Sequence, residues 1–367
     1  MKKTIVITGT HLTPALAIIK ELKKEPEKWE IYYLGRRYTM EGDKTASAES
    51  LLLPEKKINF VGIPAGRLQR RFTGWTIPSL LKVPLGFFTS LYHLAKIKPH
   101  VICSFGGYVS VPVIMAGKFL GVPSLTHEQT ITVGLANRIN GWLVDRVAIT
   151  FPQSQKFFPK KKTVLTGNPI RSEIFQQSPA LYRFLKKQPQ IYLTGGSQGA
   201  NILNKTVWPI LPQLTEKYNL IHQCGGHDYP KLQRKYQQLS KKIKDAYFLV
   251  NYIKPDSIGW AFSSELIIGR SGANTILEIA ALGKPAILIP LPKTSHNEQF
   301  LNARFLADQG GAVIISQQEL SGKKLLKTID QVFSNLNKYQ HRAQKLKKQI
   351  NTDAAKKIVD QLQQLIT

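Results

Sequence analysis

Leu193-Thr194-Gly195-Gly196-Ser197-Gln198-Gly199-Ala200 follows a short apolar run and opens an amphipathic stretch that extends to Leu214. This order predicts a strand, a glycine-rich turn and a helix. Glycines let the backbone approach an anion, and a helix start supplies unpaired N–H groups and a partial positive charge. Ser197 adds a hydroxyl donor. The pattern indicates phosphate binding, with a tight turn without ligand as the alternative; it is not the dinucleotide pattern G-x-G-x-x-G, which disfavours an NAD enzyme.

A second turn of this kind spans 269–275, after an apolar run, and leads into Ile276-Leu277-Glu278. A carboxylate one turn into a helix can accept both hydroxyls of a ribose while the loop backbone binds phosphate. The alternative is that Glu278 only complements the helix dipole, which stabilises by less than about 1 kcal/mol.

Around these two turns, apolar runs of strand length alternate with amphipathic stretches along the whole chain. The predicted strands are 4–7, 31–34, 58–61, 101–104, 124–126, 147–150, 191–194, 220–223, 247–250, 266–268, 286–289 and 312–315. Such alternation predicts an α/β protein with parallel sheets covered on both faces. Two sheets of six strands fit this pattern better than one sheet of twelve.

The chain has 367 residues, more than the roughly 250–300 at which one hydrophobic core stops growing. Two domains are therefore expected, with the junction in 151–169, which contains two prolines, a lysine run and Gly167-Asn168-Pro169. The predicted parts are an N-terminal domain (1–166), a C-terminal domain (167–340) and a terminal helix (341–367) that packs back on the N-terminal domain. Open parallel sheets bind ligands at the carboxyl ends of their strands, so the site is expected in a cleft between two facing sheets.

Charge is the unusual feature of the composition: 51 Lys and Arg against 23 Asp and Glu give a formal net charge of +28. Such a charge attracts nucleic acid, an anionic membrane face or phosphorylated substrates. Two cysteines exclude a disulfide framework and favour a reducing compartment. The apolar run after Met1 is too short for a secretory signal. The run 101–117 is shorter than the roughly 20 residues of a membrane span, and its glycines and proline predict strand, loop and helix.

Two polar groups follow predicted strands of the first half. Thr8-Gly9-Thr10-His11 follows the first strand, and a histidine there can act as a general base near neutral pH. The alternative is a structural or solvated histidine. His127-Glu128-Gln129 ends another strand, where active sites of open sheets lie. No histidine pair has the spacing and third ligand of a zinc site.

The stretch 75–88 combines aromatic and leucine side chains with arginines immediately upstream. Basic residues beside an apolar face are typical of docking on an anionic membrane surface, with a core helix as the alternative. The docking candidates are Arg67, Arg70, Arg71, Trp75, Leu80, Leu81, Phe87 and Phe88. The other lysine pairs are scattered and form no stripe with interleaved aromatics, which disfavours specific nucleic-acid binding.

Taken in order, six motifs resemble those of the bacterial MurG family. They are 106–112 (GGYVSVP), His127-Glu128-Gln129, 167–171 (GNPIR), 195–200 (GGSQGA), 270–273 (RSGA) with Glu278, and Gln299 with Asn302-Ala303. The resemblance covers nearly the whole chain. It implies the GT-B fold, two Rossmann-like domains facing across a cleft, and a peripheral membrane glycosyltransferase without metal or other cofactor. In this family N-acetylglucosamine passes with inversion from UDP-N-acetylglucosamine to undecaprenyl-linked lipid I, which gives lipid II for peptidoglycan, and hence for cell wall growth, shape and division.

The resemblance also implies roles for individual residues. The backbone of Ile253 would contact the uracil, Glu278 the ribose, and Gln299 the sugar hydroxyls. The remaining donor residues, mainly around the diphosphate, would be Arg171, Ser197, Ala273, Asn274, Thr275, Ile276 and Leu277. Thr8, Gly9, Thr10 and Thr130 would bind the acceptor. The enzyme would act at the cytoplasmic membrane face. His11 and Glu128 would lie on the acceptor side of the cleft, and one of them, preferably His11, would deprotonate the acceptor hydroxyl.

Two departures from the family pattern fall on the acceptor half. Val6-Ile7-Thr8-Gly9-Thr10-His11 stands where the family has Gly-Gly-Thr-Gly-Gly-His, and Thr10 tolerates positive φ poorly. Thr130 replaces an asparagine after His-Glu-Gln. The residues assigned to the donor therefore match the family pattern more fully than those assigned to the acceptor. Three alternatives remain: a different lipid acceptor such as a diacylglycerol, a non-catalytic homologue, and, on charge alone, a nucleic-acid-binding protein.

Overall fold

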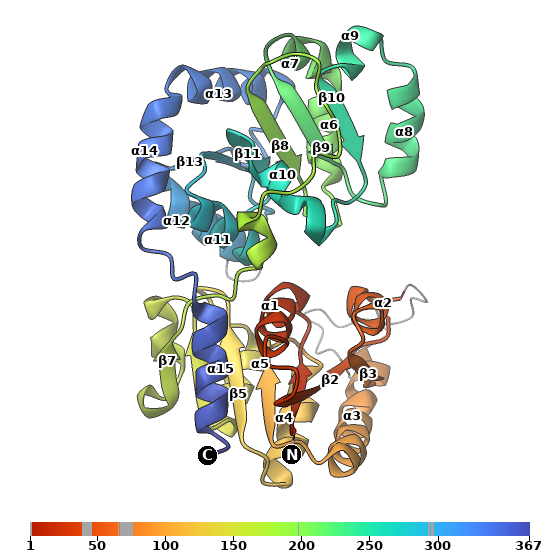
Figure 1. Ribbon diagram of the computed structural model, residues 1–367, viewed down its shortest axis with the longest axis vertical. Coiled ribbons are helices and arrows are strands. Elements are labelled where there is room, and N and C mark those ends of the chain that lie inside the picture. Colours follow the sequence, from red (N-terminus) through yellow and green to blue (C-terminus); the bar gives the residue numbers. More distant parts are fainter. Residues whose placement is uncertain are drawn as a thin grey trace. The chain divides into compact units, whose positions relative to one another are not determined.

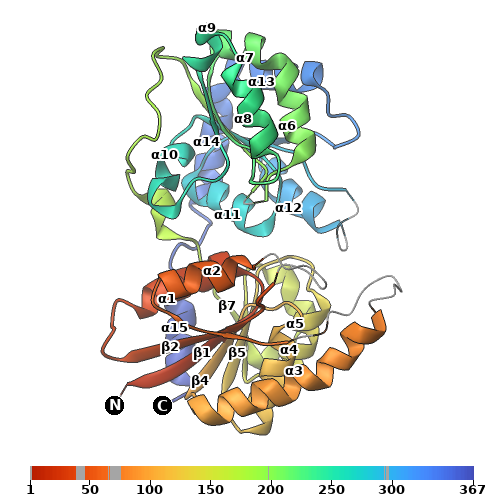
Figure 2. The same cartoon turned by 90° about the vertical axis from the view of Figure 1, so that its right-hand side faces the viewer.

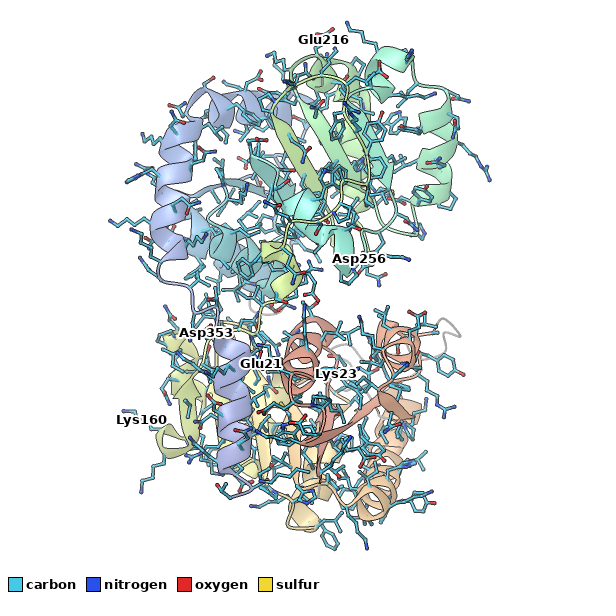
Figure 3. The ribbon with its side chains drawn as sticks, in the orientation of Figure 1. Glu21, Lys23, Lys160, Glu216, Asp256 and Asp353 are labelled. Carbon is cyan, nitrogen blue, oxygen red and sulfur yellow. The ribbon has the colours of Figure 1, made fainter. Side chains whose placement is uncertain are left out.

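The computed structural model describes residues 2–38, 46–64, 66, 76–196, 198–292, 294 and 297–367, with side chains of the 76–97 helix described from residue 82. The chain divides into two compact units, one made of Met1–Arg171 with Asn351–Thr367 and the other of Ser172–Ile350. Each contains one sheet with helices packed against it (Figures 1 and 2). Exposed charged side chains such as Lys160 and Glu216 project from their surfaces (Figure 3).

The first unit has a fully parallel sheet of seven described strands in the order β3-β2-β1-β4-β5-β6-β7. The strands are β1 Lys3–Thr8, β2 Trp29–Gly35, β3 Asn59–Gly62, β4 Val101–Ser104, β5 Ser124–Glu128, β6 Arg146–Ile149 and β7 Thr163–Leu165. The helices are α1 Leu12–Leu22, α2 Ala48–Glu55, α3 Thr76–Ile97, α4 Ser110–Phe119, α5 Leu135–Leu143 and α15 Ala354–Gln364, with 3₁₀ turns η1 Pro152–Phe157 and η2 Lys160–Lys162.

Side chains of β1 alternate between the two buried faces of this sheet. Ile5 and Ile7 pack in a cluster with α1 and α15, whereas Val6 packs in a second cluster with α3 and α4. Successive strand residues point to opposite faces, and a parallel sheet covered on both sides therefore reads as a continuous apolar run. This is why the buried strands could be predicted from the sequence.

The second unit repeats the design with a parallel sheet of six described strands in the order β10-β9-β8-β11-β12-β13. The strands are β8 Gln190–Thr194, β9 Asn219–Gln223, β10 Tyr247–Val250, β11 Leu266–Gly269, β12 Ala286–Leu288 and β13 Ala312–Ile314. The helices are α6 Asn201–Val207, α7 Leu211–Lys217, α8 Tyr229–Gln237, α9 Lys241–Lys244, α10 Ile258–Phe262, α11 Ala273–Leu282, α12 Glu298–Ala307, α13 Gly322–Ser334 and α14 Leu336–Lys347, with 3₁₀ turns η3 Ser172–Phe175, η4 Trp208–Ile210 and η5 Pro255–Ser257.

The prediction of six strands in the first half was wrong, because β7 lies inside the segment interpreted as a junction. This strand has three residues and no buried side chain. It pairs only with β6 at the edge of the sheet. A strand so short and exposed has no apolar run by which it could be recognised.

The expected single helix over 341–367 is instead divided. Its beginning is the end of α14, in the second unit, and its end is α15, which packs on α1 in the first unit. The chain returns to the first unit at Asn351, whose Nδ2 donates to the Thr166 carbonyl over 2.9 Å. The run 101–117 forms β4, a loop and most of α4. Within the described part of the chain, no helix combines the length and the apolar character needed to cross a bilayer.

Candidate active site

In the first unit, the loop after β1 lies against the loop after β4, because these strands are neighbours in the sheet. The Thr10 N–H donates to the Gly106 carbonyl over 3.0 Å. The buried Tyr33 hydroxyl donates to the Gly9 carbonyl over 2.8 Å. Gly9 has a φ of +132°, a conformation that favours glycine. The one glycine of the family pattern retained here thus stands where the turn requires it.

Thr10 belongs to a residue type that tolerates positive φ poorly, and it does not have a positive φ in this loop. Positive φ among the described non-glycine residues is confined to Lys57, Lys98 and Asn297. The side chain of Thr10 lies over Gly107, where an added Cβ would be only 2.1 Å from Thr10 Oγ1. The missing side chain of Gly107 therefore provides the space that Thr10 occupies.

His11 follows this turn as an exposed residue at the start of α1. Its Nδ1 lies 2.7 Å from the Phe105 carbonyl oxygen. A carbonyl oxygen can only accept a hydrogen bond. In the neutral ring the proton therefore lies on Nδ1, which donates a hydrogen bond to the Phe105 carbonyl. Nε2 is then the unprotonated nitrogen, the form that a general base requires.

Glu128, at the end of β5, is held by several donors although it is 3% exposed. Its Oε1 accepts from the Thr130 N–H over 2.9 Å and lies 2.7 Å from the Thr130 hydroxyl. Its Oε2 accepts from Asn137 Nδ2 over 2.9 Å. Buried carboxylate oxygens need such donors. Thr130 therefore holds Glu128 in place, and Glu128 is fixed in the loop framework.

Asn137 is a site residue that the sequence did not reveal. Its Nδ2 also donates to the His127 carbonyl over 3.1 Å, and its Oδ1 accepts from the Thr126 hydroxyl over 3.0 Å. An added Cβ on Gly106 would be 2.7 Å from this amide. Asn137 thus hydrogen-bonds to β5 and packs against the glycine turn after β4, a role that only the packing of α5 makes visible.

His127, between Thr126 and Glu128 on β5, has a structural role and not a catalytic one. It is fully buried, and its Nε2 lies 3.0 Å from the Gly167 carbonyl oxygen. Burial lowers the pKa of His127 to about 4, because a charged imidazolium is poorly solvated there. His127 is therefore a neutral structural residue.

In the second unit, the glycine-rich turn between β8 and α6 packs backbone against backbone. An added Cβ on Gly195 would be 2.2 Å from the Ala200 nitrogen, and one on Gly199 would be 2.1 Å from the Cys224 carbonyl oxygen. Gly196 and Gly199 have φ values of +80° and +75°. These contacts require glycine and leave peptide groups at the start of a helix, which is the chemistry of an anion site. Ser197 lies outside the described residues.

The second predicted turn lies beside the first, since β11 pairs with β8. Glu278 is 3% exposed within α11, in the turn after its first. The Ser271 hydroxyl donates to the Gln299 carbonyl over 2.7 Å, and Gln299 Oε1 accepts from the Leu291 N–H over 3.0 Å. Gln299 is thereby joined to the start of α11.

Ile253 belongs to the same strand-end cluster. Its N–H donates to Gln223 Oε1 over 3.1 Å, and Gln223 Nε2 donates to the Gly196 carbonyl over 3.0 Å. The second unit thus places three predicted groups beyond the carboxyl ends of its strands: Ile253 after β10, 273–278 after β11 and Gln299 after β12. Arg171 is the last residue of the first unit's long segment. Thr8 is the buried last residue of β1.

An exposed apolar patch lies on the first unit, on the face of α3 that carries Leu85, Phe88 and Tyr92, which are 53%, 64% and 62% exposed. Phe87 contacts Phe88 and also Phe119 of α4, itself 74% exposed. We call these four exposed residues the α3–α4 patch. The predicted Arg67, Arg70, Arg71 and Trp75 lie outside the described residues, as do the side chains of Leu80 and Leu81.

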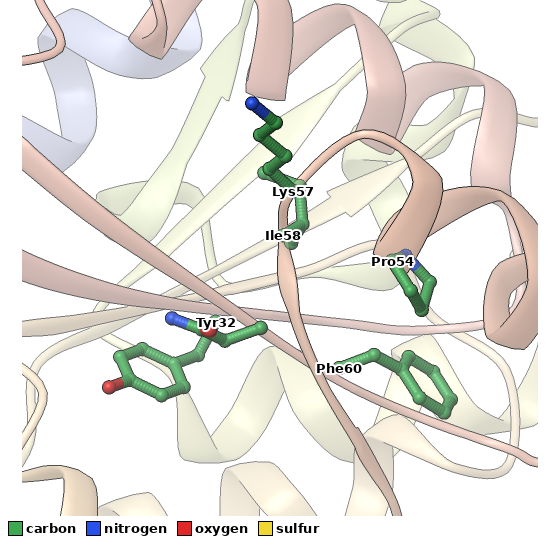
Figure 4. Close-up of a pocket in the computed structure, with 6 residues that line it drawn as sticks. Tyr32, Pro54, Lys57, Ile58 and Phe60 are labelled. Atoms are coloured by element: carbon green, nitrogen blue, oxygen red, sulfur yellow. The ribbon is translucent and has the colours of Figure 1, made fainter.

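A depression at the amino end of edge strand β3 is lined by Tyr32, Pro54, Lys57, Ile58, Asn59 and Phe60, away from the strand ends that carry His11 (Figure 4). No cluster of three or more His, Cys, Asp or Glu in the described ranges could hold a metal ion.

Two models of one family match the chain: the glycosyltransferase family 28 N-terminal domain over residues 4–149, and the C-terminal domain of that family over 190–358. This chain belongs to glycosyltransferase family 28. The first matched segment lies in the first unit, and the second covers the sheet of the second unit and ends within α15 of the first. Together they contain both sets of strand-end loops described above. The two Rossmann-like parallel sheets are those of the GT-B fold.

This family 28 chain is similar to curated proteins named UDP-N-acetylglucosamine--N-acetylmuramyl-(pentapeptide) pyrophosphoryl-undecaprenol N-acetylglucosamine transferase. The Clostridium tetani protein is 33% identical over 348 residues, 92% of each chain. A Bacillus cereus protein with this name, numbered 2, is 33% identical over 98% of this chain and 99% of its own. The crystal structure of Acinetobacter baumannii MurG matches 99% of this chain and 100% of its own, with a TM-score of 0.72 and 27% identity. The resemblance to the MurG family is confirmed.

Proposed function

We propose that this chain transfers N-acetylglucosamine from UDP-N-acetylglucosamine to the C4 hydroxyl of the muramic acid in lipid I, which gives lipid II for peptidoglycan synthesis. The observation that carries the proposal is the set of strand-end loops, present in family order in both units. The near full-length likeness to enzymes named for this reaction supports the same substrates.

The second unit is the proposed donor site. UDP would place its diphosphate at the N–H groups of the turn 195–200 and of the start of α11, where helix dipoles favour negative charge. Glu278 would accept hydrogen bonds from the ribose hydroxyls, and the Ile253 backbone would contact the uracil. Gln299 would donate its amide to the sugar hydroxyls. The same N–H groups stabilise the diphosphate as it leaves, which accelerates the reaction.

The first unit is the proposed acceptor site, with His11 as the general base. Its Nε2 takes the proton of the acceptor hydroxyl while the oxygen attacks the anomeric carbon. The bond to the UDP oxygen breaks from the opposite side, so the configuration inverts. Glu128 is the weaker candidate because its oxygens already accept from Thr130 and Asn137. We assign Glu128 to holding the acceptor loop.

A transfer assay tests the reaction. Purified protein, radiolabelled UDP-N-acetylglucosamine and a lipid I analogue should give labelled disaccharide product, and the His11→Ala protein serves as the control. A diacylglycerol acceptor in competition should leave the product unchanged. Folded protein that binds UDP but transfers no sugar to lipid I would refute the proposal and favour a non-catalytic homologue.

The α3–α4 patch is proposed to dock the enzyme on the cytoplasmic membrane face, where lipid I carries its head group. Phe88 and Phe119 supply apolar surface, and the exposed Lys96 and Lys118 lie on the same two helices. Apolar and basic groups together bind anionic interfaces. Phe119 was absent from the docking residues predicted from the sequence.

Vesicle sedimentation tests this surface. A Phe88→Ser, Phe119→Ser double variant should lose most binding to vesicles with anionic lipid, while a short soluble acceptor is still glycosylated. The matched control is Phe175→Ser, which removes an exposed phenylalanine from the second unit. Equal binding by the double variant and the parent would exclude the α3–α4 patch.

A further inference from the structure

Gln223 is the last residue of β9, the strand between β8 and β10. It is paired in register with Thr194 on one side and Val250 on the other. The chain leaves β8 into the glycine-rich turn and leaves β10 toward Ile253. Gln223 therefore stands between the two segments that the proposed function assigns to the diphosphate and to the uracil.

The side-chain amide of Gln223 contacts both segments. It is 4% exposed. Nε2 donates to the Gly196 carbonyl over 3.0 Å, and Oε1 accepts from the Ile253 N–H over 3.1 Å. The Tyr192 hydroxyl donates to the same Oε1 over 3.2 Å.

The partners determine which way the amide faces. A backbone N–H only donates and a carbonyl only accepts, so the reversed amide would place NH₂ against the Ile253 N–H and oxygen against the Gly196 carbonyl. Neither a carboxylate nor an apolar side chain can satisfy both segments. A buried polar group left unpaired is costly, so this side chain links the two segments through hydrogen bonds that both of them need.

We infer that Gln223 is a positioning residue of the nucleotide-sugar site. It sets the distance between the backbone that binds the diphosphate and the backbone that contacts the base. The inference rests on the proposed function, because it takes Ile253 and the turn 195–200 as donor contacts. Gln223 itself touches neither reacting atom and acts through these two segments.

Gln223→Met tests the inference by keeping side-chain length and removing the hydrogen bonds to Gly196 and Ile253, together with those to Tyr192 and Thr194. Preorganisation of a site contributes to affinity, so we expect UDP to bind about tenfold more weakly, measured by calorimetry. KM for UDP-N-acetylglucosamine should rise by a similar factor, with kcat at saturation and the acceptor KM nearly unchanged. The matched control is Gln190→Met, which removes the amide that donates to Ser264 at the opposite end of the same sheet.

Gln223→Glu provides a second readout that a merely structural role would not move. A carboxylate can still accept from Ile253 but repels the Gly196 carbonyl, whereas a protonated carboxyl can donate to it. The ratio of UDP dissociation constants, variant over parent, should therefore fall as the pH is lowered from about 8 to about 6, since burial raises a carboxyl pKa.

The outcomes separate the inference from the function on which it rests. If the parent binds neither UDP nor its sugar, the proposed function fails. If the parent binds UDP and Gln223→Met binds it as tightly or more tightly, only the inference is overturned; tighter binding would mean that Gln223 competes with uracil for the Ile253 N–H. A folded Gln223→Glu protein with a pH-independent ratio also contradicts the positioning role.

Discussion

The two units share the order of six strands, to which the first unit adds β7, but they differ in what fills their strand-end loops. In the second unit, Gly195 and Gly199 bring backbone against backbone, so the loop consists largely of peptide groups. In the first unit, the Thr10 side chain covers Gly107, and buried side chains such as Asn137 support the loop. Peptide N–H groups suit a fixed anion, whereas proton transfer needs a titratable side chain. The same framework thus favours diphosphate binding in one unit and acid–base chemistry in the other.

The largest expected effect tests the chemical role of the first unit. His11→Ala should lower kcat by about 10²- to 10⁴-fold, the usual contribution of a general base. UDP affinity should be unchanged, because His11 is not among the residues proposed to contact the donor. Steady-state kinetics and calorimetry on the same preparation measure both quantities. A kcat within threefold of the parent would remove His11 from catalysis.

Each unit contains a buried histidine that should make the stability of the protein sensitive to acid. Burial lowers the pKa of His127 to about 4 and that of His222 to about 3, from 6.5. The unfolded chain then binds the extra proton more readily than the folded one, so stability is present above pH 6.5 and falls as the pH falls toward 4 and 3. Each histidine should contribute about 1.4 kcal/mol per pH unit in its window.

Urea unfolding at several pH values measures this dependence. Carboxylates also titrate in acid, so the informative quantity is the difference between the parent and His127→Gln or His222→Gln. Each variant should lose part of the slope, and the His222 contribution should extend to lower pH. Parallel curves for parent and variants would show that these histidines do not destabilise the folded state in acid.

Glu278→Ala sharpens the donor side of the comparison. Loss of the ribose acceptor should raise KM for UDP-N-acetylglucosamine about 10- to 100-fold, since unpaired ribose hydroxyls cost about 1.4–2.7 kcal/mol. The kcat value should change little. Glu216→Ala, an exposed carboxylate of the same unit, is the control. An unchanged KM would mean that Glu278 only complements the dipole of α11.

The last comparison concerns stability alone and isolates the packing of Thr10 against Gly107. Gly107 and Gly196 have nearly equal φ values, +83° and +80°, but only Gly107 has a neighbour where a Cβ would stand. Both alanine substitutions should destabilise by about 1 kcal/mol through the backbone. Gly107→Ala should cost about 1–3 kcal/mol more through the clash.

A double-mutant cycle with Thr10→Gly checks this difference by urea unfolding. The extra cost of Gly107→Ala should disappear when Thr10 is glycine, because the clashing side chain is gone. Additive costs would mean that Thr10 and Gly107 do not share this space.

Local pattern determined the architecture of this protein. Both faces of each sheet are buried, so strands such as β1 and β11 appear as apolar runs, and the glycines and polar residues that follow them mark the strand ends. Strand β7 escaped prediction because it is short and exposed, and the division of the C-terminal helix near Asn351 depends on a contact with Thr166, far away in sequence.

The tertiary structure alone decided how the site residues are held. Nothing in the sequence near Thr10 indicates that Gly107 makes room for it, and nothing near Gln223 or Asn137 indicates which segments their amides join. Hydrophobic periodicity is a local property, whereas hydrogen bonds between loops depend on which strands become neighbours. The sequence therefore determined which residues lie at the strand ends, and the packing of the strands and helices determined which partners each of these residues contacts.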